Sequence, residues 1–104
     1  MGAVAGVKRY PRLDANHNEI VAGLERLGVS VCSLAQLGGG VPDLLIGVRG
    51  QLFLLEIKNP KQKPSDRELT PDQKTWFAKW RGRPPVVVMS LADACAAIGL
   101  EVAL

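Results

Sequence analysis

Two carboxylates and a lysine occupy positions where metal-assisted chemistry could take place. Asp43 follows Pro42 in one apolar stretch, and Glu56 and Lys58 stand at the end of the next. Carboxylate oxygens suit Mg²⁺ or Mn²⁺, which retain several waters and accept phosphate oxygens. A lysine beside such an ion can orient or activate a water, or offset charge on a phosphorane-like transition state. The alternative is a structural ion pair at a sheet edge.

The convergence of these groups depends on a predicted hairpin. Two runs rich in β-forming residues flank Arg49-Gly50, a dipeptide typical of a two-residue turn. This turn places Asp43 opposite Glu56 on one face, with Cβ atoms about 4.5–5.5 Å apart, and Lys58 projects from the same face. A slip of one residue would send Asp43 to the other face. The two runs are residues 41–48 and 51–57.

A helix is predicted over residues 16–27 and ends at Gly28. Asn16 and Glu19 have the spacing of a capping box. Glu19 therefore has two interpretations, as a capping partner or as an acidic group that borders the core face. We interpret His17, the one histidine of the chain, as a surface or capping residue.

A second helix is predicted to begin after Thr70, because Pro71 suits the first helical position and Gln73 completes a capping box. Gln73 shares one helical face with an aromatic group. Core packing is the first interpretation of these aromatics, and stacking on splayed nucleobases is the alternative. The group consists of Trp76, Phe77 and Trp80.

The remaining elements predict a mixed sheet. Strands are expected at residues 29–34 and 85–89, a last helix at 90–98 capped by Ser90 and Asp93, and a short final strand at 101–104. The hairpin is apolar on both faces, so helices should cover both sides of the sheet. The glycine-rich loop at 36–40 is expected to turn tightly and to let substrate approach Asp43.

These motifs resemble a known nuclease pattern. Pro42-Asp43, followed by Glu56-Ile57-Lys58, is similar to the PD-(D/E)xK signature. With the residues at 40–44 and the segment 69–73 leading into Trp76, the likeness extends to the small stand-alone form of the VRR-NUC family, the virus-type replication and repair nucleases. It covers residues 14–90. The resemblance implies an α+β restriction-endonuclease-like αβββαβ core with helices on both faces of the sheet, which agrees with the predicted elements.

The resemblance also implies roles for site residues. Asp43, Glu56 and the backbone carbonyl of Ile57 would bind Mg²⁺ or Mn²⁺, with Glu19 as a further acidic candidate. Lys58 would position or activate the attacking water, and the glutamine of the family corresponds to Gln73. The implied activity is a divalent-metal-dependent, structure-selective DNA endonuclease.

The substrate and the assembly follow from the same resemblance. Small members look like homodimers that cleave branched DNA such as four-way (Holliday) junctions. The alternatives are a nuclease for RNA or undistorted duplex, and a non-catalytic DNA-binding subunit. Apolar residues of the last helix and the tail predict a homodimer through the C-terminal half: Ala92, Cys95, Ala96, Ile98 and residues 102–104.

Composition is consistent with these expectations. The 104 residues predict one domain with an irregular segment at 1–13, and the net charge of +3 permits a polyanionic partner. The loop at 59–68 has two interpretations, as a segment that binds phosphates or as a solvated connection. The candidate nucleic-acid contacts are Lys8, Arg9, Arg12, Lys61, Lys63 and Arg67.

The cysteines and the lengths of the apolar runs indicate where in the cell the protein would be found. Cys32 and Cys95 lie in apolar stretches without metal-ligand spacing, which predicts small buried residues in a reducing compartment. No apolar run reaches ~18 residues, so no membrane span is expected. We therefore expect a cytoplasmic protein of a bacterial or phage-infected cell.

Overall fold

The computed structural model describes residues 15–100 of the chain. The predicted basic cluster of Lys8, Arg9 and Arg12, the irregular segment at 1–13 and the final strand at 101–104 lie outside the described residues. The elements are α1 (Ala15–Arg26), β1 (Ser30–Ser33), β2 (Leu44–Val48), β3 (Gln51–Ile57), the 3₁₀ turn η2 (Pro64–Arg67), α2 (Pro71–Lys79), β4 (Val86–Val88) and α3 (Leu91–Ala97).

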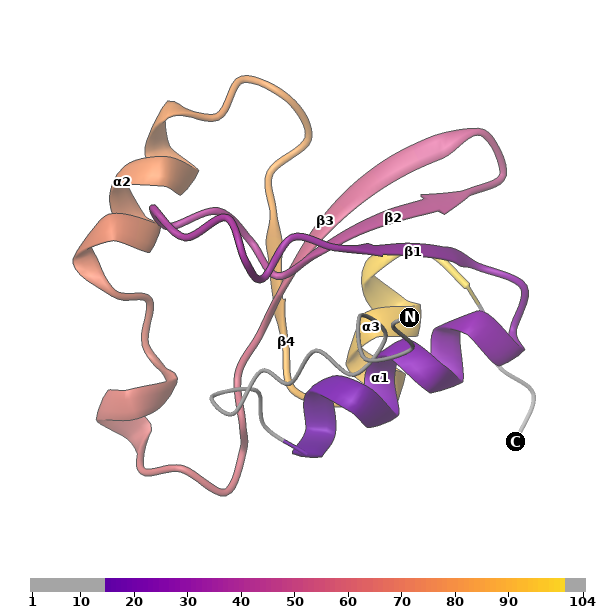
Figure 1. Cartoon of the computed structure of the whole chain (residues 1–104), viewed down its shortest axis with the longest axis horizontal. Coiled ribbons are helices and arrows are strands. Elements are labelled where there is room, and N and C mark those ends of the chain that lie inside the picture. Colours follow the sequence, from indigo (N-terminus) through magenta and orange to yellow (C-terminus); the bar gives the residue numbers. More distant parts are fainter. Residues whose placement is uncertain (1–14, 101–104) are drawn as a thin grey trace, which may run out of the picture.

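The four strands form one mixed sheet in the order β1-β2-β3-β4 (Figure 1). The first three strands are an antiparallel meander, and β4 runs parallel to β3. The connection from β3 to β4 passes through η2 and α2, a crossover of the kind that parallel neighbours require. The predicted α+β architecture with a mixed sheet is confirmed.

The hairpin turn has the predicted length and register. Arg49 and Gly50 both have positive φ, 50° and 74°, which matches the twist of the flanking strands. Val48 pairs with Gln51, and the ladder runs back to Leu44 opposite Leu55. In the same register, Asp43 and Glu56 are therefore the next pair of opposed positions beyond Leu44 and Leu55. The side chain of Arg49 also donates to the carbonyl of Ile98 at 2.9 Å, which ties the turn to the end of α3.

One face of the sheet carries the hydrophobic core. Alternate hairpin residues point toward α1 and α3, and Leu44, Ile46 and Leu55 are completely buried. The helices close this face with their own buried side chains, Ile20, Leu24, Ala94, Cys95 and Ile98. Cys95 and Ile98 therefore belong to the monomer core, although the sequence had suggested that they were surplus apolar surface. Cys32 is exposed, so its predicted burial is wrong.

α2 lies over the opposite face of the sheet, at a distance from α1 and α3 in Figure 1. Its predicted start is confirmed. Thr70 accepts a hydrogen bond from the backbone of Gln73, the Gln73 side chain returns one to the backbone of Thr70, and Pro71 follows the cap. Helices thus lie on both faces, as predicted, although α2 leaves the hairpin residue Leu52 largely exposed. None of the described helices is long and apolar enough to cross a membrane.

Candidate active site

Asp43 and Glu56 lie side by side where β2 begins and β3 ends. An oxygen of Asp43, Oδ2, accepts a hydrogen bond of 2.8 Å from the backbone N–H of Ile57. This bond crosses from one strand to the other just beyond the ladder, so it holds the Asp43 carboxylate beside the neighbouring Glu56. The pairing expected from a two-residue turn has therefore brought the two carboxyl groups together.

Glu56 is an unusually placed carboxylate, because its side chain is almost completely buried. Oε2 accepts a hydrogen bond of 3.0 Å from Nε2 of Gln73 and lies 3.7 Å from Nζ of Lys58. Oε1 is buried and has no hydrogen-bond partner among the described residues. Burial, and then the neighbouring charge of Asp43, raise the pKa of Glu56 to about 8, although Lys58 acts in the opposite direction.

Lys58 completes the predicted trio on the same face. Its Nζ donates a hydrogen bond of 3.0 Å to Oε1 of Gln73, and the residue is 9% exposed. Its backbone N–H donates to the carbonyl of Val88 at 3.0 Å, which continues the β3–β4 ladder past the end of the strand. The ammonium is therefore held at the site from both its side chain and its backbone.

Gln73 connects the two charged groups. Its amide oxygen accepts from Lys58 and also from the backbone N–H of Thr70, at 2.9 Å, while its amide nitrogen donates to Glu56. The sequence left open whether Gln73 is a helix cap or a site residue. The structure shows the cap and also contacts with Lys58 and Glu56, whereas a role of Gln73 in the reaction stays a prediction. Because the cap fixes the amide orientation, Gln73 presents an acceptor to the lysine and a donor to the carboxylate.

Gly40 explains how α2 comes so close to the site. A Cβ on this residue would overlap the carbonyl of Asp72 and lie 2.9 Å from the backbone nitrogen of Gln73. The same kind of addition at Gly38 or Gly39 would meet nothing within 4 Å. The glycine-rich loop was expected to make room for substrate. At Gly40 the structure shows that it makes room for the first turn of α2.

Asn16 is a site neighbour that sequence reasoning missed. Its Nδ2 donates to the carbonyl of Lys58 at 2.9 Å and to that of Met89 at 3.3 Å. Its Oδ1 is buried and has no partner within residues 15–100. The predicted capping box with Glu19 is wrong, because Asn16 lies inside α1 and its side chain reaches across to the sheet. Nothing in the local spacing distinguishes this contact from a cap.

The other predicted residues are placed less centrally. Glu19 is exposed and lines a separate cleft of about 470 Å³ together with Asn59 and Lys61. Its role at the metal site stays a prediction. His17 is buried, so its predicted surface position is wrong. Of the basic residues in the loop after β3, Lys61 and Lys63 are exposed, whereas Arg67 is half-buried and its Nε has no partner in the described part of the chain.

The donor set fits a divalent cation that keeps several waters. Within residues 15–100 no three His, Cys, Asp or Glu side chains form a metal-binding group. The side-chain ligands available at this site are therefore the two carboxylates. A buried, unpartnered oxygen on Glu56 beside a second carboxylate requires either a proton or a cation. Mg²⁺ is commonly bound by one or two carboxylates and waters.

Comparison with known proteins gives one informative match. No protein-family model and no curated protein matches the chain. A solved structure described as a VRR_NUC domain is similar to it, with a TM-score of 0.52 and 27% sequence identity. The alignment covers 83% of this chain and 97% of that one. Together with the motif residues gathered at the site, this match supports the assignment of the chain to the VRR-NUC family as a nuclease domain.

Proposed function

We propose that this nuclease domain is a divalent-metal-dependent endonuclease that hydrolyses phosphodiester bonds of DNA, with branched DNA such as four-way junctions as its preferred substrate. The observation that carries the proposal is the buried Glu56 beside Asp43, with a raised pKa and an unpartnered oxygen, in contact with a buried lysine. A structural ion pair would need one carboxylate for one lysine. The second carboxyl group must either stay protonated, as the raised pKa of Glu56 indicates for the metal-free protein, or have its charge balanced by a cation.

Each residue has a distinct task in this proposal. Asp43, Glu56 and the carbonyl of Ile57 would hold the ion, which when bound polarises the scissile phosphate. Lys58 is held by Gln73, so its ammonium is oriented before substrate arrives. It orients the attacking water and offsets the negative charge that develops on the phosphoryl oxygens. Gln73 keeps both groups at fixed positions because the helix cap fixes its own amide.

Branched DNA enters the proposal together with a homodimer. Resolution of a four-way junction requires nicks on two opposing strands, and this chain supplies one such site. A two-fold dimer would present two sites, and an isologous interface is the commonest way to build one. Light scattering tests the assembly. A monomeric mass at all concentrations, with nicks on one strand only, would contradict the dimer and the junction-resolving role.

The decisive experiment is a side-by-side cleavage assay with Mg²⁺ and with Mn²⁺. The substrates are a four-way junction, a flap, a plain duplex and single-stranded RNA. We expect the junction to be cleaved fastest, chelator to abolish cleavage, and Asp43→Asn or Glu56→Gln to abolish it while the circular dichroism spectrum stays unchanged. Wild-type rates in Glu56→Gln would refute the mechanism. Preferred cleavage of RNA or of plain duplex would favour the second substrate class, and binding without any cleavage would favour a non-catalytic subunit.

A further inference from the structure

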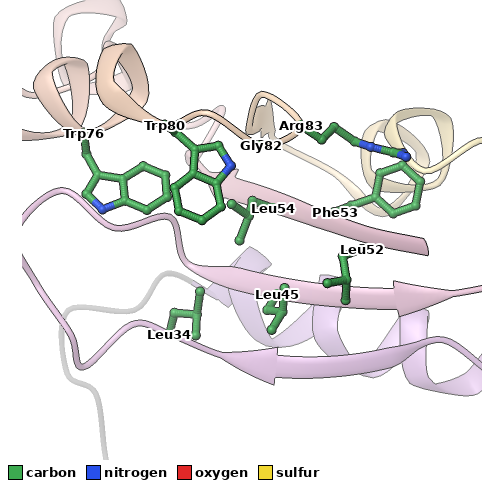
Figure 2. A pocket seen from close by; sticks show the side chains of 9 residues that line it. All are labelled: Leu34, Leu45, Leu52, Phe53, Leu54, Trp76, Trp80, Gly82 and Arg83. Carbon is green, nitrogen blue, oxygen red and sulfur yellow. The ribbon is translucent and has the colours of Figure 1, made fainter. Parts of the chain in front are cut away.

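A second cavity opens beside the active site, on the α2 face of the sheet. It has a volume of about 430 Å³. Figure 2 shows Leu45, Leu52 and Leu54 from the hairpin on one side, and Trp76 and Trp80 from α2 and its C-terminal end on the other. The size falls within the range of small-molecule pockets, roughly 300–1,000 Å³. The lining presents few groups that could form hydrogen bonds.

The walls of this cavity contain large apolar side chains that remain exposed. Leu52 is 65% exposed and Trp80 is 44% exposed. Neither belongs to the hydrophobic core, which lies on the other face of the sheet. A contiguous exposed apolar patch on a small domain commonly marks a binding site. The core-packing interpretation of the tryptophans therefore does not account for Trp80.

The two tryptophans form an aromatic wall. Their rings are stacked, with centroids 4.7 Å apart and an angle of 17° between the planes. Stacked, partly exposed indoles offer a flat surface to another planar ring. Proteins that bind single-stranded nucleic acid use such surfaces, because every base has a π face and stacking tolerates any sequence.

Two residues of the cavity lining, Leu54 and Trp76, are near neighbours of active-site residues along their own elements. Leu54 precedes Glu56 by two residues, so both side chains lie on one face of β3, about 6.6–6.8 Å apart along the strand. Trp76 follows Gln73 by three residues, so the two share one face of α2. Each wall of the cavity is thus an extension of an element that carries a site residue. A substrate bound at Glu56 has the cavity as its immediate neighbour.

Three exposed basic residues lie at or near the aromatic wall in the sequence, and we refer to Lys79, Arg81 and Arg83 as the cationic rim. Lys79 and Arg81 flank Trp80 in the sequence and are exposed, and neither forms an ion pair with any described residue. Arg83 lies on the cavity lining, with its guanidinium 4.0 Å from the centre of the Phe53 ring. An apolar floor with a cationic rim is complementary to a base attached to a phosphate backbone.

We propose that this cavity binds an unstacked nucleobase of the substrate strand, next to the phosphate that is cleaved. The inference rests on the proposed function, since it takes the substrate to be a nucleic acid. The base is held by stacking and apolar contact rather than by hydrogen bonds to its edges, so recognition does not depend on sequence. Bases that are already unpaired enter most easily, because a duplex must first be unstacked. A second copy of the chain would leave the cationic rim facing an equally cationic rim.

The test measures binding without cleavage. An oligothymidylate and an abasic strand of equal length are titrated into the whole protein in chelator at fixed salt, with tryptophan fluorescence as the readout. We expect the wild type to bind the strand with bases about 5- to 150-fold more tightly, as base–aromatic stacking implies. Trp80→Ala should reduce this ratio toward one, and Trp80→Phe should retain part of it.

A matched pair of leucines controls for general surface effects. Leu52→Ser should lower the ratio, whereas Leu37→Ser should not, because Leu37 is as exposed at 66% but does not line the cavity. Equal affinity of the wild type for both strands, with cleavage intact, would overturn the inference. A dimer that Leu52→Ser dissociates, without base-dependent binding, would overturn it in favour of a second copy. Base-dependent binding by a protein that cleaves nothing would overturn the nuclease proposal and the position beside a cleaved phosphate, but it would support the cavity as a nucleobase site.

Discussion

The two faces of the sheet differ in what their residues do. On the face that packs against α1 and α3, Leu55 is completely buried, and nearly every hairpin side chain belongs to the core. On the α2 face, the same strand carries Glu56 under the first turn of α2 and Leu52 in the open. One strand therefore supplies the core with one set of side chains and the active site with the other.

The difference shows where this fold can place reactive groups. Above its ordinary pKa, a buried carboxyl group whose pKa is raised lowers the free energy of unfolding. Other parts of the molecule must therefore supply the free energy that keeps the protein folded. The α1/α3 face supplies it through burial of apolar surface. The α2 face can then hold charged and exposed apolar groups in positions that serve binding. The predictions below test this division, from the largest expected effect to the smallest.

Removal of the lysine should affect the reaction much more than the binding of DNA. We expect Lys58→Ala to lower the single-turnover rate about 10²- to 10³-fold, the typical loss when one group that stabilises transition-state charge is removed. Affinity for DNA in chelator should stay close to that of the wild type. Weak binding combined with a normal single-turnover rate would instead show that Lys58 is an ordinary phosphate contact.

A matched pair of leucines on β3 tests the contrast between the faces. Leu55→Ala should lower the free energy of unfolding by about 2–5 kcal/mol, because it leaves a cavity in the core. Leu52→Ala should change it by less than about 0.5 kcal/mol, because this side chain is largely exposed. Urea unfolding followed by circular dichroism measures both. Equal losses would contradict the division between a stabilising face and a binding face.

Glu56 should make the metal-free protein less stable as the pH rises. Its pKa in the folded state is about 8, above the ordinary value of 4.5, so the folded protein binds the proton more tightly than the unfolded chain does. The stability from this group is complete below the ordinary pKa and is lost as the pH rises toward 8. The loss should be at most a few kcal/mol.

Thermal unfolding in chelator across this pH range measures the effect. Glu56→Gln should flatten the dependence, because the amide does not titrate. Mg²⁺ or Mn²⁺ should restore stability to the wild type at pH 8 but not to Glu56→Gln. A wild-type profile that matches that of Glu56→Gln throughout would show that the carboxyl group is not perturbed.

The approach of α2 to the site should depend on Gly40. Gly40→Ala forces a methyl group into the backbone of Asp72, and overpacking of this kind costs roughly 1–3 kcal/mol. Gly39→Ala is the control. The φ of Gly39 is also positive, 64° compared with 87° for Gly40, but a methyl group added at Gly39 has no neighbour within 4 Å. Turnover should fall further in Gly40→Ala than in the control. Equal turnover would mean that the position of α2 does not control Gln73.

Local signals in the sequence predicted the parts of the site that depend on neighbours along the chain. The Arg49-Gly50 turn determined the register, and the register placed Asp43 beside Glu56. The Thr70 cap placed the start of α2 and the orientation of Gln73. A two-residue turn and a capping box are specified within a few residues, so one sequence is enough to identify them.

Contacts between distant segments could not be predicted in the same way. Asn16 has the spacing of a cap, yet it binds the carbonyl of Lys58, 42 residues away. Cys95 and Ile98 looked like surplus apolar surface, yet α3 packs them into the core. Periodicity indicates that a face is apolar, but it does not say which neighbour will cover that face.

The amino-acid sequence by itself determined the turn, the caps of α2 and α3, the alternation of side chains along β3 and hence the trio of Asp43, Glu56 and Lys58. Only the tertiary structure decided that Gln73 joins the lysine to the glutamate, and that Gly40 admits α2. Tertiary packing also left the α2 face partly uncovered beside the site. The reason is physical: backbone geometry restricts the first set of features residue by residue, whereas the second set depends on how completely separate elements bury one another.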